Sequence, residues 1–372
     1  MSLSDSERER YRRHLALSEI GAAGQEKLKA ARVLVVGAGG LGSPAALYLA
    51  AAGCGTLGLL DGDRIDLTNL QRQVLFDSPS VGQHKAEAGR ERLRALNPEL
   101  RIIAHALELR AANVRELFAQ YDVVLDGTDR LSARYLINDA CVLMRRPFIS
   151  AAIHRFEGHL ITYVPDQGPC YRCLFPQAID GLVANCAEAG VLGVLPGVLG
   201  TLQATEAIKL ITGVGELLTG RLLAYDALEM RFTEFKVSRR RDCAVCGEAP
   251  TITEPRDMSR DSQGLDEIRR LSAAALQQLL ERGEKPLLVD VREDVEFSAG
   301  HLPGALHIPL GQLPQRLAEI GPQSAPVFIC RSGGRSMAAC QRALRAIIRS
   351  PANLEGGMLA WAATIDPSVR VV

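Results

Sequence analysis

The sequence lacks a long apolar run and an excess of charge of either sign, and each absence excludes a class of protein. No apolar segment approaches the ~20 residues that a helix needs to cross a bilayer. Lys plus Arg and Asp plus Glu each number 43 among 372 residues, so the net charge of zero gives no global case for nucleic acid or a membrane surface as a partner. No signal-peptide pattern opens the chain, and we expect a cytoplasmic protein.

The cysteines lack the arrangement of a disulfide framework. Nine cysteines, four of them in two C-x-x-C pairs, indicate metal or redox chemistry in a reducing cytoplasm. The pairs Cys170/Cys173 and Cys243/Cys246 form the ligand set of a closed tetrahedral site, and we predict one structural Zn²⁺ there. Four ordinary core cysteines would require both pairings by chance. An open catalytic zinc is disfavoured because four thiolates leave no position for water.

Residues 32–73 contain the pattern around which we expect the first domain to be organised. Val33–Val36 is an unbroken apolar run, typical of a strand buried on both faces of a parallel sheet. Gly37, Gly39 and Gly42 follow as G-x-G-x-x-G, which allows a tight turn, close approach to a pyrophosphate and close packing of the next helix. The positive end of that helix would face the anion.

The next motifs indicate which nucleotide is bound. A second apolar run, Thr56–Leu60, ends at Asp61, the spacing at which a carboxylate binds a ribose hydroxyl. Up to this point a nicotinamide or flavin oxidoreductase is an alternative. The N-L-Q-R-Q motif at residues 69–73 favours ATP, because cleavage of its α–β phosphate bond needs fixed positive charge, and Arg72 can supply it bidentately.

Three motifs, in this order and spacing, resemble the MoeB/ThiF family, relatives of the ubiquitin-activating enzymes: GAGGLG, LLDGD and TNLQRQ. The resemblance implies an α/β fold with a Rossmann-like, doubly wound mixed sheet that binds ATP and Mg²⁺. It implies catalytic roles for Arg72, for Lys85 at the triphosphate and for Arg13, which would reach the phosphates of the neighbouring subunit in a homodimer. The nucleotide-binding residues implied by the family motifs are Gly37, Gly39, Gly40, Gly42, Asp61, Asp63, Asn69, Gln73, Asp129 and Arg130.

Lys85 and Asp129 also have arguments of their own. Lys85 lies in the first turn of a predicted helix over 82–96, where the helix dipole disfavours a structural lysine; a solvated surface lysine is the alternative. Asp129 follows a predicted strand over 121–125, at the edge where a doubly wound fold places its ligands. We predict that Asp129 caps the helix over 131–144 and also serves Mg²⁺ or the phosphates.

The remaining expectations for the first domain concern segments at its margins. We predict a charged helix over Ser4–Leu17, two or three strands over 147–163 with a turn at Gly158, and a helix at a subunit interface over 201–211. Cys186 lies in A-N-C-A-E-A-G, which resembles the family loop whose cysteine accepts the acyl group. We therefore treat Cys186 as a candidate catalytic thiol, with a structural cysteine as the alternative.

The composition changes after Gly247. We predict a first domain over 1–247, a polar linker over 248–270 and a second, smaller α/β domain over 271–372. The motifs DVREDVEFSAGHLPGALHIP and CRSGGRS resemble rhodanese sulfurtransferases over this whole second domain.

The predicted sulfur site lies where a strand ends. Cys330 begins a loop whose backbone N–H groups would hold an anion and stabilise a thiolate, and Gly333 and Gly334 allow that shape. Arg331 and Arg335 can carry the charge of thiosulfate or a persulfide. Related phosphatases need five residues between cysteine and arginine, whereas Cys330 and Arg335 have four between them, so the smaller loop favours sulfur over a phosphatase or an inert binding module.

The two resemblances together imply an enzyme that adenylylates the C-terminal glycine of a small ubiquitin-like sulfur-carrier protein ending in Gly-Gly. A persulfide on Cys330, loaded by thiosulfate or a cysteine desulfurase, would then supply sulfur for a thiocarboxylate. The carrier's pathway stays open among molybdopterin, thiamine, cysteine and tRNA thiolation. The alternative, an oxidoreductase with an accessory rhodanese module, leaves the N-L-Q-R-Q motif unexplained.

Overall fold

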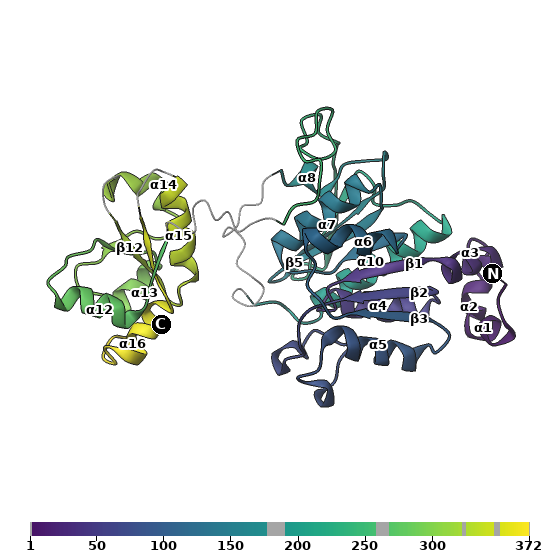
Figure 1. Cartoon of the computed structure of the whole chain (residues 1–372), viewed down its shortest axis with the longest axis horizontal. Coiled ribbons are helices and arrows are strands. Elements are labelled where there is room, and N and C mark those ends of the chain that lie inside the picture. Colours follow the sequence, from purple (N-terminus) through teal and green to yellow (C-terminus); the bar gives the residue numbers. More distant parts are fainter. Residues whose placement is uncertain (1, 177–189, 258–267, 322–324, 346–349, 372) are drawn as a thin grey trace. The chain divides into compact units, whose positions relative to one another are not determined.

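The computed structural model describes residues 2–176, 190–257, 268–321, 325–345 and 350–371. These residues form two compact units (Figure 1). None of the helices in this part of the chain combines the length and the apolar character needed to span a bilayer.

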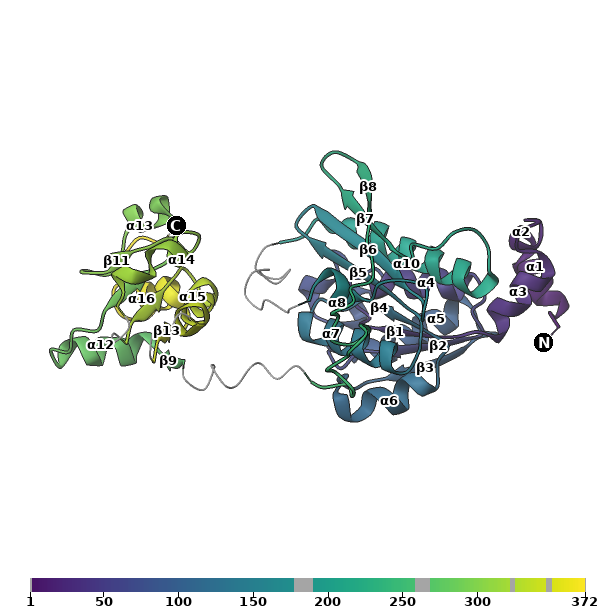
Figure 2. The same ribbon diagram turned by 90° about the horizontal axis from the view of Figure 1, so that it is seen from above.

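The first unit is built on an eight-stranded sheet with the order β3-β2-β1-β4-β5-β6-β7-β8. Its parallel strands are β3 (Arg101–His105), β2 (Thr56–Leu60), β1 (Arg32–Val36), β4 (Val123–Asp126) and β5 (Phe148–His154). Its antiparallel strands are β6 (Glu157–Tyr163), β7 (Arg221–Asp226) and β8 (Arg231–Lys236), with the β7–β8 hairpin at the edge (Figure 2). This topology confirms the predicted doubly wound mixed sheet.

Helices cover both faces of this sheet. One face carries α4 (Gly42–Ala51), α5 (Lys85–Leu96) and α10 (Leu195–Thr212), and the other carries α6 (Ala111–Ala119), α7 (Leu131–Leu143) and α8 (Tyr171–Leu174). In β1, Val33 and Val35 pack against the first face, while Leu34 and Val36 pack against the second. The strand is therefore apolar at successive positions because both of its faces are buried.

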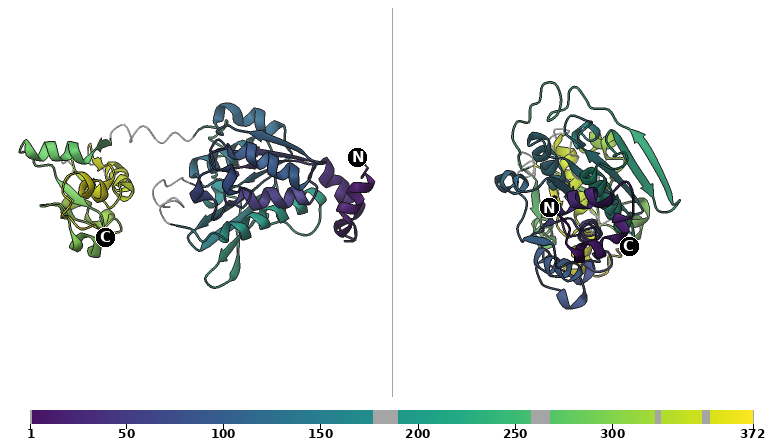
Figure 3. Two further views of the ribbon diagram at one scale, coloured as in Figure 1. Left: turned by 90° about the horizontal axis from the view of Figure 1, so that it is seen from below. Right: turned by 90° about the vertical axis from the view of Figure 1, so that its right-hand side faces the viewer.

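Shorter helices complete the first unit. The N-terminal helices α1 (Asp5–Arg10), α2 (Arg12–Leu15) and α3 (Gly21–Ala30) stand together at one end of the unit (Figure 3). The 3₁₀ turns η1 (Leu67–Asn69) and η2 (Ser78–Ser80) lie between β2 and α5.

Several predicted elements differ from the observed ones. The N-terminal helix is interrupted at Tyr11, the helix predicted over 82–96 begins only at Lys85, and α10 begins at Leu195 rather than at residue 201. The prediction of a turn at Gly158 is wrong, because Gly158 lies inside β6. A Cβ atom there would come within 3.0 Å of the Ala152 carbonyl oxygen, so close packing in the sheet explains the glycine.

The second unit contains a parallel five-stranded sheet in the order β11-β10-β12-β13-β9. The strands are β9 (Arg269–Leu271), β10 (Leu288–Asp290), β11 (Leu306–His307), β12 (Val327–Ile329) and β13 (Ala352–Leu354). The helices are α12 (Ala273–Glu281), α13 (Asp294–Ala299), α14 (Leu313–Arg316), α15 (Gly334–Arg345) and α16 (Gly357–Thr364), with the 3₁₀ turn η3 at Leu317–Glu319. One apolar cluster of this unit includes α15, and a separate one includes α12 and α16. This unit is therefore also a layered α/β domain.

Candidate active sites

The glycine loop between β1 and α4 has no room for side chains at two positions. Gly37 has φ +87°, and a Cβ atom there would lie 2.9 Å from the carbonyl oxygen of Gly127. A Cβ atom at Gly42 would lie 1.9 Å from the carbonyl oxygen of Gly37. The loop after β1 therefore packs backbone to backbone against the loop after β4, at the carboxyl edge of adjacent parallel strands, where doubly wound folds bind ligands.

Asp61, at the end of β2, fastens this loop. Its two carboxylate oxygens accept backbone N–H bonds from Ala38 and Asp63, both at 2.9 Å. Burial raises the pKa of Asp61, although the nearby Lys85 ammonium and the two backbone donors oppose that shift. Each carboxylate oxygen has a second acceptor position, so the predicted bond to a ribose hydroxyl is compatible with this geometry.

The N-L-Q-R-Q motif packs directly onto the glycine loop. A Cβ atom at Gly40 would lie 3.4 Å from Arg72 Cγ, and one at Gly39 would lie 3.7 Å from Gln73 Nε2. The Asn69 carbonyl oxygen accepts the backbone N–H bonds of Arg72 and Gln73, at 3.1 and 2.9 Å, which fixes the turn that carries them. Tertiary packing therefore brings together the predicted nucleotide residues of both motifs.

Lys85 lies beside the same site and is not a solvated surface lysine. Only 6% of the residue is exposed, its Nζ lies 3.3 Å from Asp63 Oδ2, and its backbone N–H donates to the Asp63 carbonyl oxygen at 3.0 Å. Arg130 Nη2 lies 3.9 Å from Asp63 Oδ1, and its Nη1 lies 3.3 Å from Glu108. Asp63 thus lies within ion-pair distance of two predicted cationic residues, Lys85 and Arg130.

Asp129 follows β4 and is exposed. The prediction that it caps α7 is wrong: the N-cap residue is Arg130, and no side chain bonds to the free backbone donors there. Within the described residues, no hydrogen bond or ion pair engages the Asp129 carboxylate, so its geometry is compatible with the second predicted role, at Mg²⁺ or the phosphates.

A buried cluster that the sequence analysis missed holds the Asp129 loop. The fully buried Asp126 carboxylate accepts hydrogen bonds from Thr128 N (3.1 Å), Thr128 Oγ1 (2.7 Å), Arg134 Nε (3.1 Å) and Ser150 Oγ (2.7 Å). Arg134 Nη2 also donates to the carbonyl oxygens of Thr128 (2.8 Å) and Ala151 (3.0 Å). Burial lowers the pKa of Arg134, but Asp126 and Tyr171 together outweigh it and the net shift is upward. The sequence signal that could have revealed this cluster is an aspartate at the end of a strand, followed by an arginine eight residues later.

Two predicted catalytic residues are not joined to this site. Arg13 is exposed on α2, and among the described residues no hydrogen bond or ion pair links it to the glycine loop. Cys186 lies outside the described residues.

The four predicted zinc ligands converge. Cys170, Cys173, Cys243 and Cys246 are buried, and their sulfur atoms all lie within 4.8 Å of one another. The nearest sulfur pairs are 3.4, 3.6 and 4.0 Å apart, close to the ~3.8 Å expected of ligands 2.3 Å from a tetrahedral Zn²⁺. The backbone N–H of Arg240 donates to Cys173 Sγ at 3.4 Å, which helps to stabilise a thiolate. The donor set therefore fits Zn²⁺ in a closed, structural site.

Cys330, in the second unit, ends β12 as predicted. Its sulfur accepts hydrogen bonds from Gly333 N (3.1 Å) and Ser336 Oγ (3.2 Å), and the Ser336 hydroxyl also contacts the Gly333 carbonyl oxygen. Gly333 has φ +97°, so the loop shape requires glycine there. These donors point at the sulfur of a loop that leads into α15, an arrangement suited to a thiolate or a bound anion.

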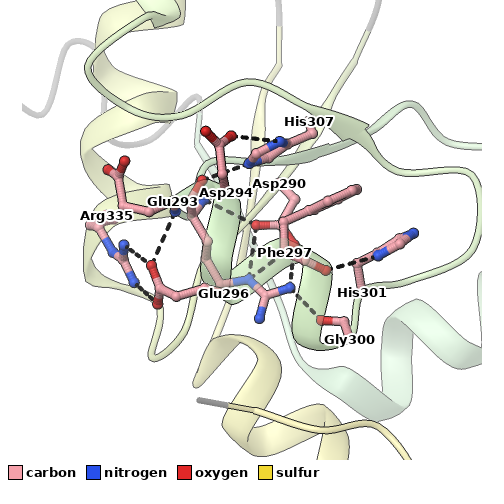
Figure 4. A network of polar contacts seen from close by, with 10 residues as sticks. Asp290, Glu293, Asp294, Glu296, Phe297, Gly300, His301, His307 and Arg335 are labelled. Atoms are coloured by element: carbon pink, nitrogen blue, oxygen red, sulfur yellow. Dashed lines mark hydrogen bonds and ion pairs between the residues drawn. The ribbon is translucent and has the colours of Figure 1, made fainter.

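Arg335 is placed differently from our prediction that it carries donor charge. Its two terminal nitrogens donate to Glu296 on α13, at 2.7 and 2.6 Å (Figure 4). The guanidinium charge is therefore balanced within the protein. Arg331 is exposed on the same loop.

Known proteins share both units. The model of the ThiF family matches residues 11–245, and that of the rhodanese-like domain matches residues 272–364. The chain is 43% identical to the adenylyltransferase and sulfurtransferase MOCS3 of Sus scrofa, over 98% of this chain and 88% of the relative. It is 41% identical to the probable adenylyltransferase/sulfurtransferase MoeZ of Mycobacterium tuberculosis, over 99% of this chain and 96% of the relative.

A solved structure resembles part of the chain. The crystal structure of E. coli MccB with ATP is 28% identical, has a TM-score of 0.57, and aligns with 66% of this chain and 75% of its own. These similarities favour the predicted adenylyltransferase over the oxidoreductase alternative. The chain belongs to the ThiF family and is an adenylyltransferase joined in one polypeptide to a rhodanese-like sulfurtransferase domain.

Proposed function

We propose that this enzyme uses ATP and Mg²⁺ to adenylylate the C-terminal glycine of a small ubiquitin-like sulfur-carrier protein, and then supplies the sulfur of a thiocarboxylate. The observation that carries the proposal is the packing of Arg72 and Gln73 on the glycine loop, with Lys85 buried beside Asp63. The reaction brings two anions together, the carrier carboxylate and the ATP phosphates. Cationic side chains lie around a glycine loop of the kind that binds phosphates. MOCS3 and MoeZ, whose names state both activities, support the same function.

In the first step, a carrier carboxylate oxygen attacks the α-phosphorus of ATP, and the bond to the β-phosphate oxygen breaks to release pyrophosphate. Arg72 and Lys85 offset the negative charge that accumulates on the phosphates. Asp61 retains acceptor positions for the ribose, and Asp129 with Arg130 would hold the phosphate end. Bound Mg²⁺ would further neutralise the phosphate oxygens.

In the second step, a persulfide on Cys330 attacks the acyl-adenylate, AMP leaves, and an acyl disulfide forms. A second thiol, for which we propose Cys186, then attacks the Cys330 sulfur and releases the carrier thiocarboxylate. The Cys330–Cys186 disulfide left behind is reopened by an external thiol reductant. Thiosulfate or a cysteine desulfurase would reload Cys330.

Further parts of the proposal concern assembly and organisation. We propose a cytoplasmic homodimer in which Arg13 completes the partner's nucleotide site. We propose an adenylyltransferase domain over 1–247, a linker over 248–270 and a sulfurtransferase domain over 271–372, and the two family matches fall within the outer ranges. The second unit begins slightly earlier than this boundary, because β9 starts at Arg269 and pairs with β13. Zn²⁺ on the four-cysteine cluster would have a structural role.

Separate assays of the two half-reactions test this function. Arg72→Ala, Lys85→Ala and Asp129→Ala should each reduce carrier-dependent ATP–pyrophosphate exchange by ~10²–10³, because each removes an oriented charge from the transition state. All three should still form the persulfide on Cys330, which mass spectrometry would detect as one added sulfur. Full exchange activity in Lys85→Ala would contradict its proposed role.

The reciprocal variants complete the test. Cys330→Ala should lose sulfur transfer while it retains pyrophosphate exchange, because every proposed adenylation residue lies in the first domain. Cys186→Ala should keep both half-reactions and at most slow thiocarboxylate release when an external reductant is present. Added sulfur found on Cys186 in the wild-type enzyme would refute this division of roles.

A further inference from the structure

The ion pair between Arg335 and Glu296 lies where the Cys330 loop enters α15. Arg335 is five residues after Cys330, and its neighbour Ser336 donates a hydrogen bond to the Cys330 sulfur at 3.2 Å. Cys330 also contributes, by Coulomb attraction, to the upward shift of the pKa of Arg335, after the larger effect of the Glu296 hydrogen bond and the opposing effect of burial. Arg335 and Ser336 share the first turn of α15, the helix end that faces the sulfur, so the charge of Arg335 can act on an anion bound at Cys330.

Glu296 neutralises this guanidinium through two hydrogen bonds, at 2.7 and 2.6 Å. The two side chains are 17% and 34% exposed, so the pair is less screened than the surface pairs of the same unit. The bonds to Arg335 lower the pKa of Glu296, against the effect of burial, so the carboxylate stays ionised at neutral pH.

The carboxylate of Glu296 is also held in place from its own side. The backbone N–H of Glu293 donates to Glu296 Oε2 at 3.0 Å, which closes a capping box at the start of α13. The buried Arg292, two residues before α13, pairs with Asp290 and donates to the carbonyl oxygen of Gly300, just after the helix, at 2.7 Å. Because the Glu296 carboxylate also accepts the Glu293 N–H, turning away from Arg335 would break that bond as well.

We propose that Glu296 is a specificity-determining residue, which lowers the preference of the sulfurtransferase site for dianionic sulfur donors by neutralising Arg335. This inference rests on the proposed role of Cys330 as the persulfide carrier. The donors to the sulfur are then the Gly333 N–H and the Ser336 hydroxyl, and the guanidinium of Arg335 is already paired. Such a site accepts a donor of low charge, such as a protein-bound persulfide, more readily than thiosulfate.

The two donors differ in the charge they bring. With thiosulfate, the Cys330 thiolate attacks the outer sulfur, a new S–S bond forms, and sulfite leaves as a dianion with the electron pair of the broken S–S bond. With a persulfide RS–SH, the same attack gives Cys330–S–SH and releases the thiolate RS⁻. Only the first reaction concentrates three negative charges at the loop, so only that reaction gains strongly from a free guanidinium.

The substitution Glu296→Gln tests this inference, because the amide can still accept hydrogen bonds but no longer neutralises Arg335. We expect the KM for thiosulfate to fall about tenfold, and the gain to shrink at high salt, since a single freed charge faces a dianion at a partly exposed site. The rate with an alkyl hydropersulfide, which brings at most one negative charge, should change less, by at most about threefold. A merely structural role predicts instead that both donors become poorer substrates.

Two variants serve as controls for this test. Glu319→Gln removes the same charge from a more exposed carboxylate, paired with Arg316, and should leave the donor preference unchanged. Adding Arg335→Ala to Glu296→Gln should abolish the gain with thiosulfate. An equal gain in Glu319→Gln, or a gain that persists without Arg335, would overturn the inference.

A measurement on the wild-type enzyme covers the case in which Glu296→Gln does not fold. The KM of the wild-type enzyme for thiosulfate should change less than about threefold between roughly 20 and 500 mM salt, and a steeper dependence would overturn the inference. Failure of the proposed function is distinguishable, because Cys330→Ala would then still acquire sulfur from either donor. If Cys330→Ala is inert and Glu296→Gln shows no gain, only the inference about Glu296 fails.

Discussion

Replacement of Arg134 by Met should destabilise the first unit by several kcal/mol. The substitution keeps an apolar stem but removes the guanidinium that lies 3.1 Å from the fully buried Asp126. A buried carboxylate that loses its counter-ion typically costs about 3–5 kcal/mol. The carbonyl oxygens of Thr128 and Ala151 also lose their Arg134 donor, but these costs overlap with the first, so we expect a loss of about 4 kcal/mol in total.

The assay uses the position of the chain's single tryptophan. Trp361 lies on α16, so its fluorescence during urea denaturation reports on the second unit, whereas circular dichroism reports on both. Arg134→Met should move a circular-dichroism transition to lower urea and leave the tryptophan transition where it is. ATP–pyrophosphate exchange should also fall, because the Asp129 loop loses the bond from Arg134 to Thr128.

Two further variants separate the buried pair from a general effect of losing an arginine. Arg145→Met breaks an ion pair with Asp166 in which both side chains are about two-thirds exposed, and such pairs contribute about 1 kcal/mol or less. The double variant Arg134→Met/Asp126→Asn removes the uncompensated charge and should recover much of the lost stability. Our reasoning would be refuted if Arg134→Met cost no more than Arg145→Met, or if the double variant were less stable than Arg134→Met.

Two other predictions concern the metal and the assembly. Freshly purified protein should contain one Zn²⁺ per chain, and Cys243→Ser should lower thermal stability and soluble yield, since removal of a ligand weakens a metal site whose binding energy stabilises the fold; metal analysis that finds no zinc would contradict this. Mixing Arg13→Ala chains with Asp129→Ala chains should restore pyrophosphate exchange, because a hybrid dimer would have one intact site. Subunit exchange without recovered activity would show that Arg13 does not act on the partner.

The sequence alone determined those features that depend on neighbouring residues. The apolar runs of β1 and β2 identified strands buried on both faces, because the alternation of partly exposed strands is missing there. The glycine loop was predictable because its backbone conformation and close approaches exclude side chains. The two C-x-x-C pairs predicted the four-cysteine cluster, since four thiols at that spacing are typical ligands of a closed zinc site.

Only the tertiary structure decided which charged side chains meet. Asp126 pairs with Arg134 because α7 packs against the end of β4, and Glu296 pairs with Arg335, 39 residues away, because α13 and α15 lie side by side in the second unit. The same packing gave Gly158 a place inside a strand rather than in a turn. Burial and pairing depend on which residues folding brings together. Local sequence patterns therefore did not reveal that Glu296 neutralises Arg335.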